Sequence, residues 1–392
     1  MGLELLDRAG GLYPELKAFK DALHAHPELS FQETRTTALV REKLAALGVE
    51  FLDLGMETGC VALLRGGRPG PAVALRADLD AIELQEPDGP GCSQVPGVMH
   101  ACGHDFHTAG LYGAAKLLAE RRGELAGDVV FLFQPAEEVG RGAAALVKHG
   151  LWEALPVRPR FVFGLHNRPE LPTGQIAVLP GPIMAGKSNF VLTLHGKSGH
   201  GGSPHKCVDA LVAAAAFIQA VQTVVSRNAD PQEALVCTVC SVHGGSPANF
   251  APDLVTLTGS IRALNDGVRA MAVGRLETLA GSIAAGYQCS YEFECQEAMP
   301  LTYNGPEATA VARRAAEALV GADHVVCTRP DLGSEDFAVY GQHVPAFFYW
   351  LGTGKPGQAN PCWHNEGFRT DDGALPLAAA LLAQSALEGL AE

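Results

Sequence analysis

Over the first 187 residues of the chain, apolar runs alternate with segments whose apolar positions recur at helical spacing. Leu16, Phe19 and Leu23 follow the spacing of a helix that buries one face, and Pro27 is expected to end that helix. Further along, the pattern predicts strands at 59–67, 71–81, 127–138 and 161–167, and a helix at 107–125 that Asp105 is placed to cap. Buried strands alternating with helices are typical of an α/β fold with a mostly parallel sheet flanked by helices.

A different pattern occupies residues 188–299. It predicts strand, helix, strand, strand, helix and strand, the order of a ferredoxin-like α+β unit with both helices on one face of an antiparallel sheet. The α/β alternation returns after residue 300. We therefore expect a discontinuous larger domain, residues 1–187 and 300–392, with a smaller domain inserted at 188–299, and a chain of 392 residues is long enough for both.

Polar side chains follow the predicted strands of the larger domain. Asp78 ends one strand, Glu137 and Glu138 end another, and His166 ends a third. Adjacent acids at a strand end are usually solvated, but the Val-Val-Phe-Leu-Phe run before these two must be buried. Because open α/β sheets bind ligands at the carboxyl ends of their strands, we expect the four side chains to meet at one edge.

The segment MHACGHDFH, residues 99–107, holds three histidines, a cysteine and an aspartate. Imidazole and thiolate are common ligands of zinc-like ions, but two ligands do not close a site, so others must come from elsewhere in the chain. The candidate ligands are Cys102, His104, Glu138, His166 and His364. Five ligands suit two ions that share one of them, whereas a single closed zinc site needs four, and the spacing leaves both open.

The adjacent acids Glu137 and Glu138 add a chemical hypothesis. Neighbouring side chains diverge, so one carboxylate can bind metal while the other accepts a proton. This division fits metal-assisted hydrolysis, in which a metal lowers the pKa of bound water to about 7 and a carboxylate takes its proton.

Charge and composition limit the kinds of partner that we expect this protein to bind. A formal charge of −14 without a run of lysines or arginines argues against nucleic acid and membranes and favours a small-molecule substrate. The N-terminus has no basic segment before an apolar core, and no later stretch is uninterrupted enough to span a membrane, so we expect a cytoplasmic protein. Cys237 and Cys240 form a CxxC within a predicted strand, where residues three apart face opposite sides, so the pair is a weak metal or redox candidate.

A series of motifs, in this order, resembles the metal-dependent amidohydrolase family that includes hippurate hydrolase, N-acyl-amino-acid amidohydrolases and plant auxin-conjugate hydrolases, a branch of the aminoacylase and carboxypeptidase metallopeptidases. The motifs are MHACGHDFH, FQPAEE, GLHNRPELPTGQI, GPIMAGKSNF, GKSGHGGSPH, GSEDFA and WHNEGF. The resemblance implies hydrolysis of N-acyl amino acids with divalent metal ions, two per chain (Zn, Mn, Co or Ni). It also implies that the larger domain binds metal and catalyses, and that the inserted domain is a lid and dimerisation domain. A ferredoxin-like sheet leaves edge strands open for pairing, so we expect a homodimer through the inserted domain.

The resemblance also assigns roles to residues. The five candidate ligands match the family's metal ligands, with Cys102 at the bridging position. Glu137 resembles the general base, and Asp78 resembles a carboxylate that orients a ligand histidine. His200 resembles a lid histidine that polarises the scissile carbonyl. Lid positions expected near the substrate carboxylate are Asn249 and Arg262.

Several residues depart from the family pattern, among them Val139 and Arg141, which make the AEEVGRGA segment less glycine-rich than usual. Arg76 stands where most of the wider family has a ligand histidine, which this branch replaces with His104. Phe250 and Trp363 stand where aliphatic residues are common, which leaves the preferred acyl group open.

Other functions remain as alternatives. A cysteine hydrolase would use Cys102 as nucleophile with His104 or His166 as base. A noncatalytic binding protein would not need Glu137. Within the metal-dependent class, a dipeptidase or carboxypeptidase and a deacetylase of a biosynthetic intermediate are alternatives to an N-acyl-amino-acid hydrolase.

Overall fold

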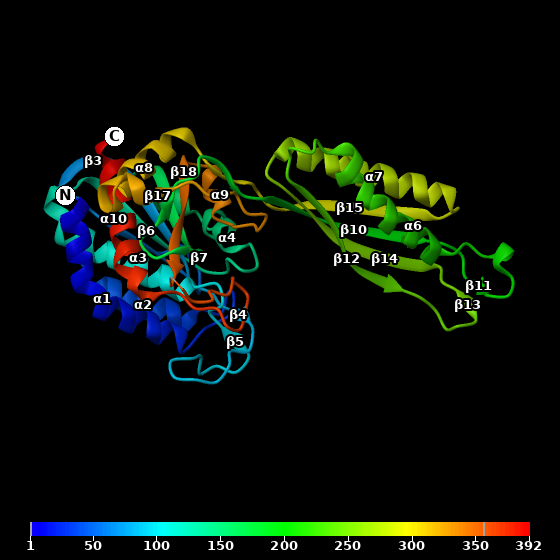
Figure 1. Ribbon diagram of the computed structural model, residues 1–392, viewed down its shortest axis with the longest axis horizontal. Helices are drawn as coiled ribbons and strands as arrows, with labels where there is room; N and C mark the ends of the chain where they lie inside the picture. Colours follow the sequence, from blue (N-terminus) through cyan, green and yellow to red (C-terminus); the bar gives the residue numbers. More distant parts are fainter. Residues whose placement is uncertain (1, 356) are drawn as a thin grey trace. The chain divides into compact units, whose positions relative to one another are not determined.

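A computed structural model describes residues 2–355 and 357–392, and the chain forms two compact units (Figure 1). The first unit comprises the chain up to Ile183, Tyr303–Arg329 and Asp336–Glu392. The second unit comprises Met184–Thr302 and Pro330–Glu335.

The first unit is built on an eight-stranded sheet. In spatial order its strands are β1 (Glu50–Leu52), β2 (Cys60–Leu64), β6 (Ala126–Gln134), β3 (Arg68–Asp78), β7 (Pro159–Pro172), β18 (Ala346–Gly354), β8 (Ile176–Ala177) and β17 (Val325–Val326). The four strands from β6 to β18 are mutually parallel. They are apolar because both sheet faces are covered, and the predicted mostly parallel sheet is confirmed.

Helices cover both faces of this sheet (Figure 1). One face packs against α1 (Gly2–His24), α2 (Thr34–Ala45), α3 (His104–Glu120), α8 (Pro306–Val320) and α10 (Leu375–Ala391). Phe347 and Tyr349 of β18 point into that core, whereas Phe348 between them contacts Phe337 on the opposite face, as strand alternation requires. The shorter helices α4 (Gly142–Lys148) and α9 (Ala338–Gly341) lie near that opposite face, and Trp152 of α5 (Leu151–Ala154) packs against Tyr340 of α9.

The helix that follows the Cys/His-rich segment begins three residues earlier than predicted, at His104. Gly103, with φ of 85°, precedes it, and Asp105 lies inside the first turn. The expected capping role of Asp105 is wrong, because its carboxylate accepts a hydrogen bond from Nδ1 of His24, 2.8 Å away. The left-handed glycine turns the chain sharply, so that Cys102 and His104 face the same region.

The second unit contains a four-stranded antiparallel sheet with two helices. The sheet order is β12 (Leu235–Gly244), β14 (Leu254–Ala263), β10 (Gly186–His195) and β15 (Ser290–Met299), and the helices are α6 (Ala210–Thr223), continued by the π-helical turn η3 (Val224–Asn228), and α7 (Asp266–Gly286). Both helices share one core with inward residues of the sheet such as Phe190 and Leu257. The predicted ferredoxin-like order is confirmed. Cys237 is buried in that core and Cys240 is exposed next to a register shift, so the two thiols do not form a pair.

Short elements complete the described chain. They are β4 (Ile82–Glu83), β5 (Val98–Met99), β9 (Gly181–Met184), β11 (Gly199–His200), β13 (Phe250–Ala251), β16 (Thr302–Asn304), η1 (Arg122–Glu124), η2 (Pro204–Lys206), η4 (Ala322–His324) and η5 (Asp372–Ala374).

Two helical segments are long and apolar enough to cross a membrane by length and composition alone, Ala210–Asn228 and Asp372–Ala391. Of the most apolar window in each, 33% of the first and 78% of the second is buried inside the protein. Both helices contribute side chains to the cores described above, as core helices of globular units do.

Candidate metal centre

Five donor side chains from separate elements converge at the carboxyl edge of the parallel strands. The ligand atoms of Cys102, His104 and His166 lie within 4.8 Å of one another. Those of Cys102, Glu138 and His364 also lie within 4.8 Å of one another. Cys102 belongs to both groups, which is the arrangement that two ions with one shared ligand require.

His104 is fully buried and presents one ring nitrogen to the cluster. Its Nδ1 lies 3.2 Å from Oδ1 of Asp80, whereas its Nε2 has no hydrogen-bond partner and lies 3.8 Å from Oε1 of Glu138. That glutamate oxygen is likewise buried without a partner. Burial opposes protonation of His104, but nearby carboxylates, Asp78 foremost, raise its pKa to about 10. These two buried ligand atoms have no hydrogen-bond partner and are surrounded by carboxylates. The negative potential of the carboxylates favours positive charge, so the atoms fit a divalent cation.

His166 is oriented by the backbone. Its Nδ1 donates to the carbonyl of Asn167 over 2.8 Å, which directs Nε2 to Sγ of Cys102, 3.4 Å away. Burial lowers the pKa of His166 well below its usual range, so the ring is neutral, as a metal ligand must be. The rings of Trp350 and Trp363 lie 5.7 and 4.8 Å from the imidazole between centroids and hold it in place.

His364 lies in the loop before η5 and is 55% exposed. Its φ of 59° is rare for a residue with a side chain, and its N–H donates to the carbonyl of Ala101 over 2.9 Å. Its Nε2 lies 3.2 Å from Oε2 of Glu138, and this hydrogen bond raises the pKa of His364. The strained backbone brings a late loop residue next to the segment that carries Cys102.

Glu137 and Glu138 follow β6 in a turn, and one oxygen of each lies within 4.8 Å of the other and of a ring nitrogen of His104. Oε2 of Glu138 faces His364, while Oε1 of Glu137 accepts the backbone N–H of Asp336 over 3.4 Å. Oε2 of Glu137 lies 4.0 Å from Nε2 of His104. Oxygens of both acids therefore lie near His104, and the contacts with Asp336 and His364 distinguish Glu137 from Glu138.

Asp78 is predicted to orient a ligand histidine, and its Oδ2 lies 3.7 Å from Nε2 of His104. Asp78 accepts from Nδ1 of His107 over 2.7 Å and from the buried Arg76 over 2.7 Å. The carboxylate at Nδ1 of His104 belongs to Asp80, two residues later. Asp78 is the last residue of β3 and Asp80 lies two residues beyond it, so the sequence did not show which of them contacts Nδ1 of His104.

His107 is a further residue that the sequence did not single out for the site. Its Nε2 accepts the backbone N–H of Asn167 over 3.0 Å, so its Nδ1 carries the proton that bonds Asp78. Both ring nitrogens are thus occupied by protein groups. His107 supports β7 next to His166 and is not placed to bind an ion.

The three predicted substrate residues lie in the second unit. His200, in β11, pairs with Phe250 of β13, and the carbonyl of Asn249 accepts the N–H of Gly201 over 2.7 Å. Arg262, in β14, donates to the carbonyl of Leu332 over 3.0 Å. His200 and Asn249 are therefore neighbours, whereas Arg262 lies elsewhere in the unit.

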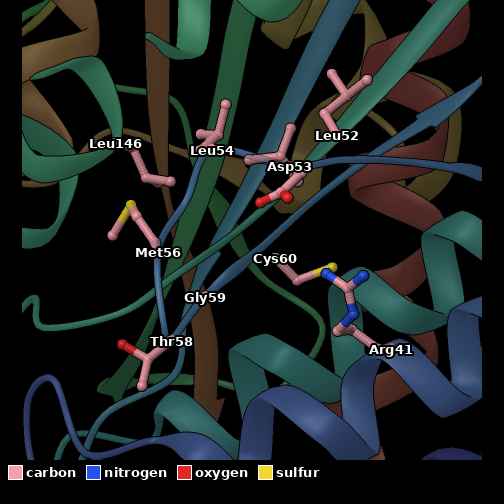
Figure 2. Close-up of a pocket in the computed structure, with 10 residues that line it drawn as sticks. Arg41, Leu52, Asp53, Leu54, Met56, Thr58, Gly59, Cys60 and Leu146 are labelled. Carbon is pink, nitrogen blue, oxygen red and sulfur yellow. The ribbon is translucent and has the colours of Figure 1, made fainter. Parts of the chain in front are cut away.

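A small pocket in the first unit is lined by none of the five candidate ligands (Figure 2). Its lining includes Arg41, Asp53, Thr58 and Cys60, and the guanidinium of Arg41 faces the Cys60 sulfur. Burial raises the pKa of the Cys60 thiol to about 12, so the thiol is unreactive.

Glu33, before α2, gives the fold a specific pH dependence. It is fully buried, and burial raises its pKa from 4.5 to about 7. Between these values the folded state holds a proton that the unfolded state has released, so this group lowers the free energy of unfolding as pH rises from 4.5 to about 7. Chemical denaturation of Glu33→Gln and wild type at pH 5 and pH 8 tests this effect. At pH 8 we expect the free energy of unfolding of Glu33→Gln to exceed that of wild type, by at most about 3 kcal/mol. An identical pH profile for both proteins would refute this assignment.

Together, the parallel sheet flanked by helices and the two-ion donor set with an adjacent carboxylate define a metal-dependent hydrolase. Residues 74–388 match the model of peptidase family M20/M25/M40, and the chain belongs to that family. It is a metal-dependent amidohydrolase, and the resemblance in its motifs is confirmed.

Named relatives cover nearly the whole chain. N-acetylcysteine deacetylase of Bacillus subtilis (strain 168) is 39% identical over 367 residues, 93% of this chain and 94% of the relative. IAA-amino acid hydrolase ILR1-like 4 of Arabidopsis thaliana is 37% identical over 378 residues, 94% of this chain and 84% of the relative. The crystal structure of Bacillus subtilis YXEP protein, described as a dinuclear metal binding peptidase from family M20, has a TM-score of 0.85, 35% identity, and coverage of 97% and 99% of the two chains.

Proposed function

We propose that this protein hydrolyses the amide bond of N-acyl amino acids, such as N-acetyl or N-benzoyl amino acids, to a carboxylic acid and a free amino acid. The observation that carries the proposal is the donor set shared through Cys102 beside the adjacent acids Glu137 and Glu138, which have different hydrogen-bond partners. Relatives named as a deacetylase of N-acetylcysteine and a hydrolase of IAA-amino acid conjugates support this substrate class. The substrate is then a small molecule, the protein binds neither nucleic acid nor membrane, and its location is cytoplasmic.

We assign the metal ligands to Cys102, His104, Glu138, His166 and His364, with Cys102 shared by two divalent ions of Zn, Mn, Co or Ni. Bound ions would polarise the scissile carbonyl and acidify the attacking water. Glu137 takes the proton of that water and delivers it to the leaving amine. His200 donates a hydrogen bond to the carbonyl oxygen as it gains charge. Asn249 and Arg262 bind the substrate carboxylate.

The geometry of the second unit suggests that these groups serve sites in two chains of a homodimer. Arg262 pairs with Lys187 at one end of β10, and His200 follows the other end of that strand, at His195. The eight residue steps from Lys187 to His195 along this extended strand span about 26 Å. A single N-acyl amino acid is too short to reach both groups of one unit, so we assign His200 and Asn249 to the site of the partner chain.

A hydrolysis screen tests the function. N-acetyl amino acids, N-benzoyl amino acids and dipeptides are incubated with protein reloaded with zinc, manganese, cobalt or nickel, and the released amino acid is measured. We expect metal-dependent release from at least one N-acyl amino acid and loss of release with a chelator. Release that survives complete metal removal would instead support a cysteine hydrolase, and cleavage of dipeptides alone would support a dipeptidase.

Substitution of Cys102 tests the shared ligand. Cys102→Ala removes a donor from both ligand groups, so we expect metal content to fall below one ion per chain in elemental analysis of dialysed protein, against two for wild type. Cys102→Asp supplies an oxygen donor and should retain two ions with a preference for harder metals. Two tightly held ions in Cys102→Ala would exclude a bridging role.

A further inference from the structure

The turn that carries Glu137 and Glu138 is held by two buried carboxylates from distant parts of the chain. The N–H of Ala136 donates to Oε1 of Glu33 over 2.8 Å. The N–H groups of Glu137 and Glu138 donate to Oδ1 and Oδ2 of Asp80 over 3.1 and 3.0 Å. Three consecutive amides are therefore held by two side chains.

This turn needs such support because its backbone is strained. Ala136 has φ of 56°, in the left-handed region that costs an alanine roughly 1 kcal/mol or more. The turn begins directly after β6, where no strand partner holds it. Without external hydrogen bonds, its amides would also be left unpaired in a buried place.

Asp80 uses its full accepting capacity here. It is 1% exposed, and each of its oxygens accepts two donors. Oδ1 receives the N–H of Glu137 and Nδ1 of His104, and Oδ2 receives the N–H of Glu138 and the hydroxyl of Ser30, which is 2.7 Å away. Every one of these partners must donate, so Nδ1 of His104 carries a proton and Nε2 is directed to the donor cluster.

We infer that Asp80 and Glu33 are positioning residues that set the geometry of the reaction centre through the Ala136–Glu138 turn. Asp80 aligns the general base, one carboxylate ligand and the reactive nitrogen of His104 at once. Glu33 holds the strained residue before them. The inference rests on the proposed function for the roles of Glu137 and Glu138, but the hydrogen bonds can be tested without turnover.

The two carboxylates differ in a way that makes the inference specific. Glu33 offers one oxygen, Oε1, to the turn, and the other polar groups that face its carboxyl are its own backbone N–H and the hydroxyl of Thr58. An amide at position 33 keeps a carbonyl for Ala136 and can donate to Thr58. At position 80, an amide nitrogen would meet two donors, so one backbone or imidazole hydrogen bond must break. The same isosteric change should therefore be tolerated at Glu33 and disruptive at Asp80.

The experiment compares Glu33→Gln, Glu33→Ala, Asp80→Asn and Ser30→Ala with wild type. The first measurement is hydrogen exchange of the amides at residues 136–138 in metal-free protein, with amides of α10 as the control for global stability. The second is zinc affinity by competition with a chelator. Neither measurement requires a substrate, so a failed hydrolysis screen would not affect the result.

We expect Asp80→Asn to speed exchange at Glu137 and Glu138 by about tenfold or more and to weaken zinc binding by about 10–100-fold, with α10 unchanged. Glu33→Ala should speed exchange at Ala136, and Glu33→Gln should restore the wild-type rate. If Asp80→Asn fails to fold, Ser30→Ala tests the inference instead. Loss of the Ser30 hydrogen bond leaves Oδ2 of Asp80 less firmly held, so amide hydrogen exchange should become faster at Glu138 alone. Wild-type exchange in both Asp80→Asn and Ser30→Ala, or equal damage in Glu33→Gln and Asp80→Asn, would overturn the inference.

Discussion

Glu137→Gln is expected to lower kcat by about 10²–10⁴ or more while leaving the metal content unchanged. Oε1 of Glu137 accepts the N–H of Asp336, and the carbonyl of a glutamine can keep that hydrogen bond. The amide has no basicity, so only proton transfer is lost. The measurement is kcat on the best substrate of the hydrolysis screen, together with elemental analysis of the same sample.

Glu138→Gln is the matched variant, one residue along the same turn. Its carboxylate lies 3.2 Å from Nε2 of His364 and 3.8 Å from Nε2 of His104, so a neutral amide weakens the ligand set itself. We expect this variant to lose metal and to recover part of its activity at high metal concentration. Equal metal loss in both variants would contradict the division between base and ligand.

His200→Ala is expected to keep its fold and metals but lose about 10²–10³ in turnover, the cost of one hydrogen-bond donor to a developing oxyanion. His200 is exposed, and its Nδ1 accepts the N–H of Gly202 over 2.9 Å, so Nε2 carries the ring proton that can be donated. Because the residue packs against little, its truncation should not disturb the unit. The expected readout is a fall in kcat with a small change in KM.

Mixing His200→Ala with Glu137→Gln tests whether His200 acts across a dimer. In a heterodimer, one site receives an intact Glu137 from one chain and an intact His200 from the other, so activity should return to about a quarter of the wild-type value after equal mixing and exchange. Heterodimers shown to form by mass spectrometry but lacking activity would exclude the role in trans. Wild-type turnover by His200→Ala alone would remove the residue from the mechanism.

Much of the architecture could be predicted because buried strands and helices have characteristic patterns of apolar residues in the sequence. The continuous apolar runs of β3, β6 and β7 predicted a sheet covered on both faces, and their polar ends predicted the edge where the donors converge. The order of elements at 188–299 predicted a sheet covered on one face, and burial along β10 and β14 alternates as such a sheet requires. These signals depend on the period of each element and need no knowledge of tertiary contacts.

The hydrogen-bonded supports of the site could not be predicted in this way. Glu33 and Ala136 are 103 residues apart, and no local pattern shows that they meet. Asp78 and Asp80 share a strand end and a residue type, so only the structure shows that Asp80 contacts His104. Asp105 was assigned as a cap because its position suited one, but burial next to His24 provided a stronger partner.

The two-ion centre bridged by Cys102 is the central claim, and anomalous diffraction from crystals of zinc-loaded protein tests it most directly. At the zinc absorption edge we expect two peaks per chain, each about 2.3 Å from Sγ of Cys102. One peak should also contact His104 or His166, and the other Glu138 or His364. A single peak, or two peaks of which only one contacts Cys102, would contradict the account.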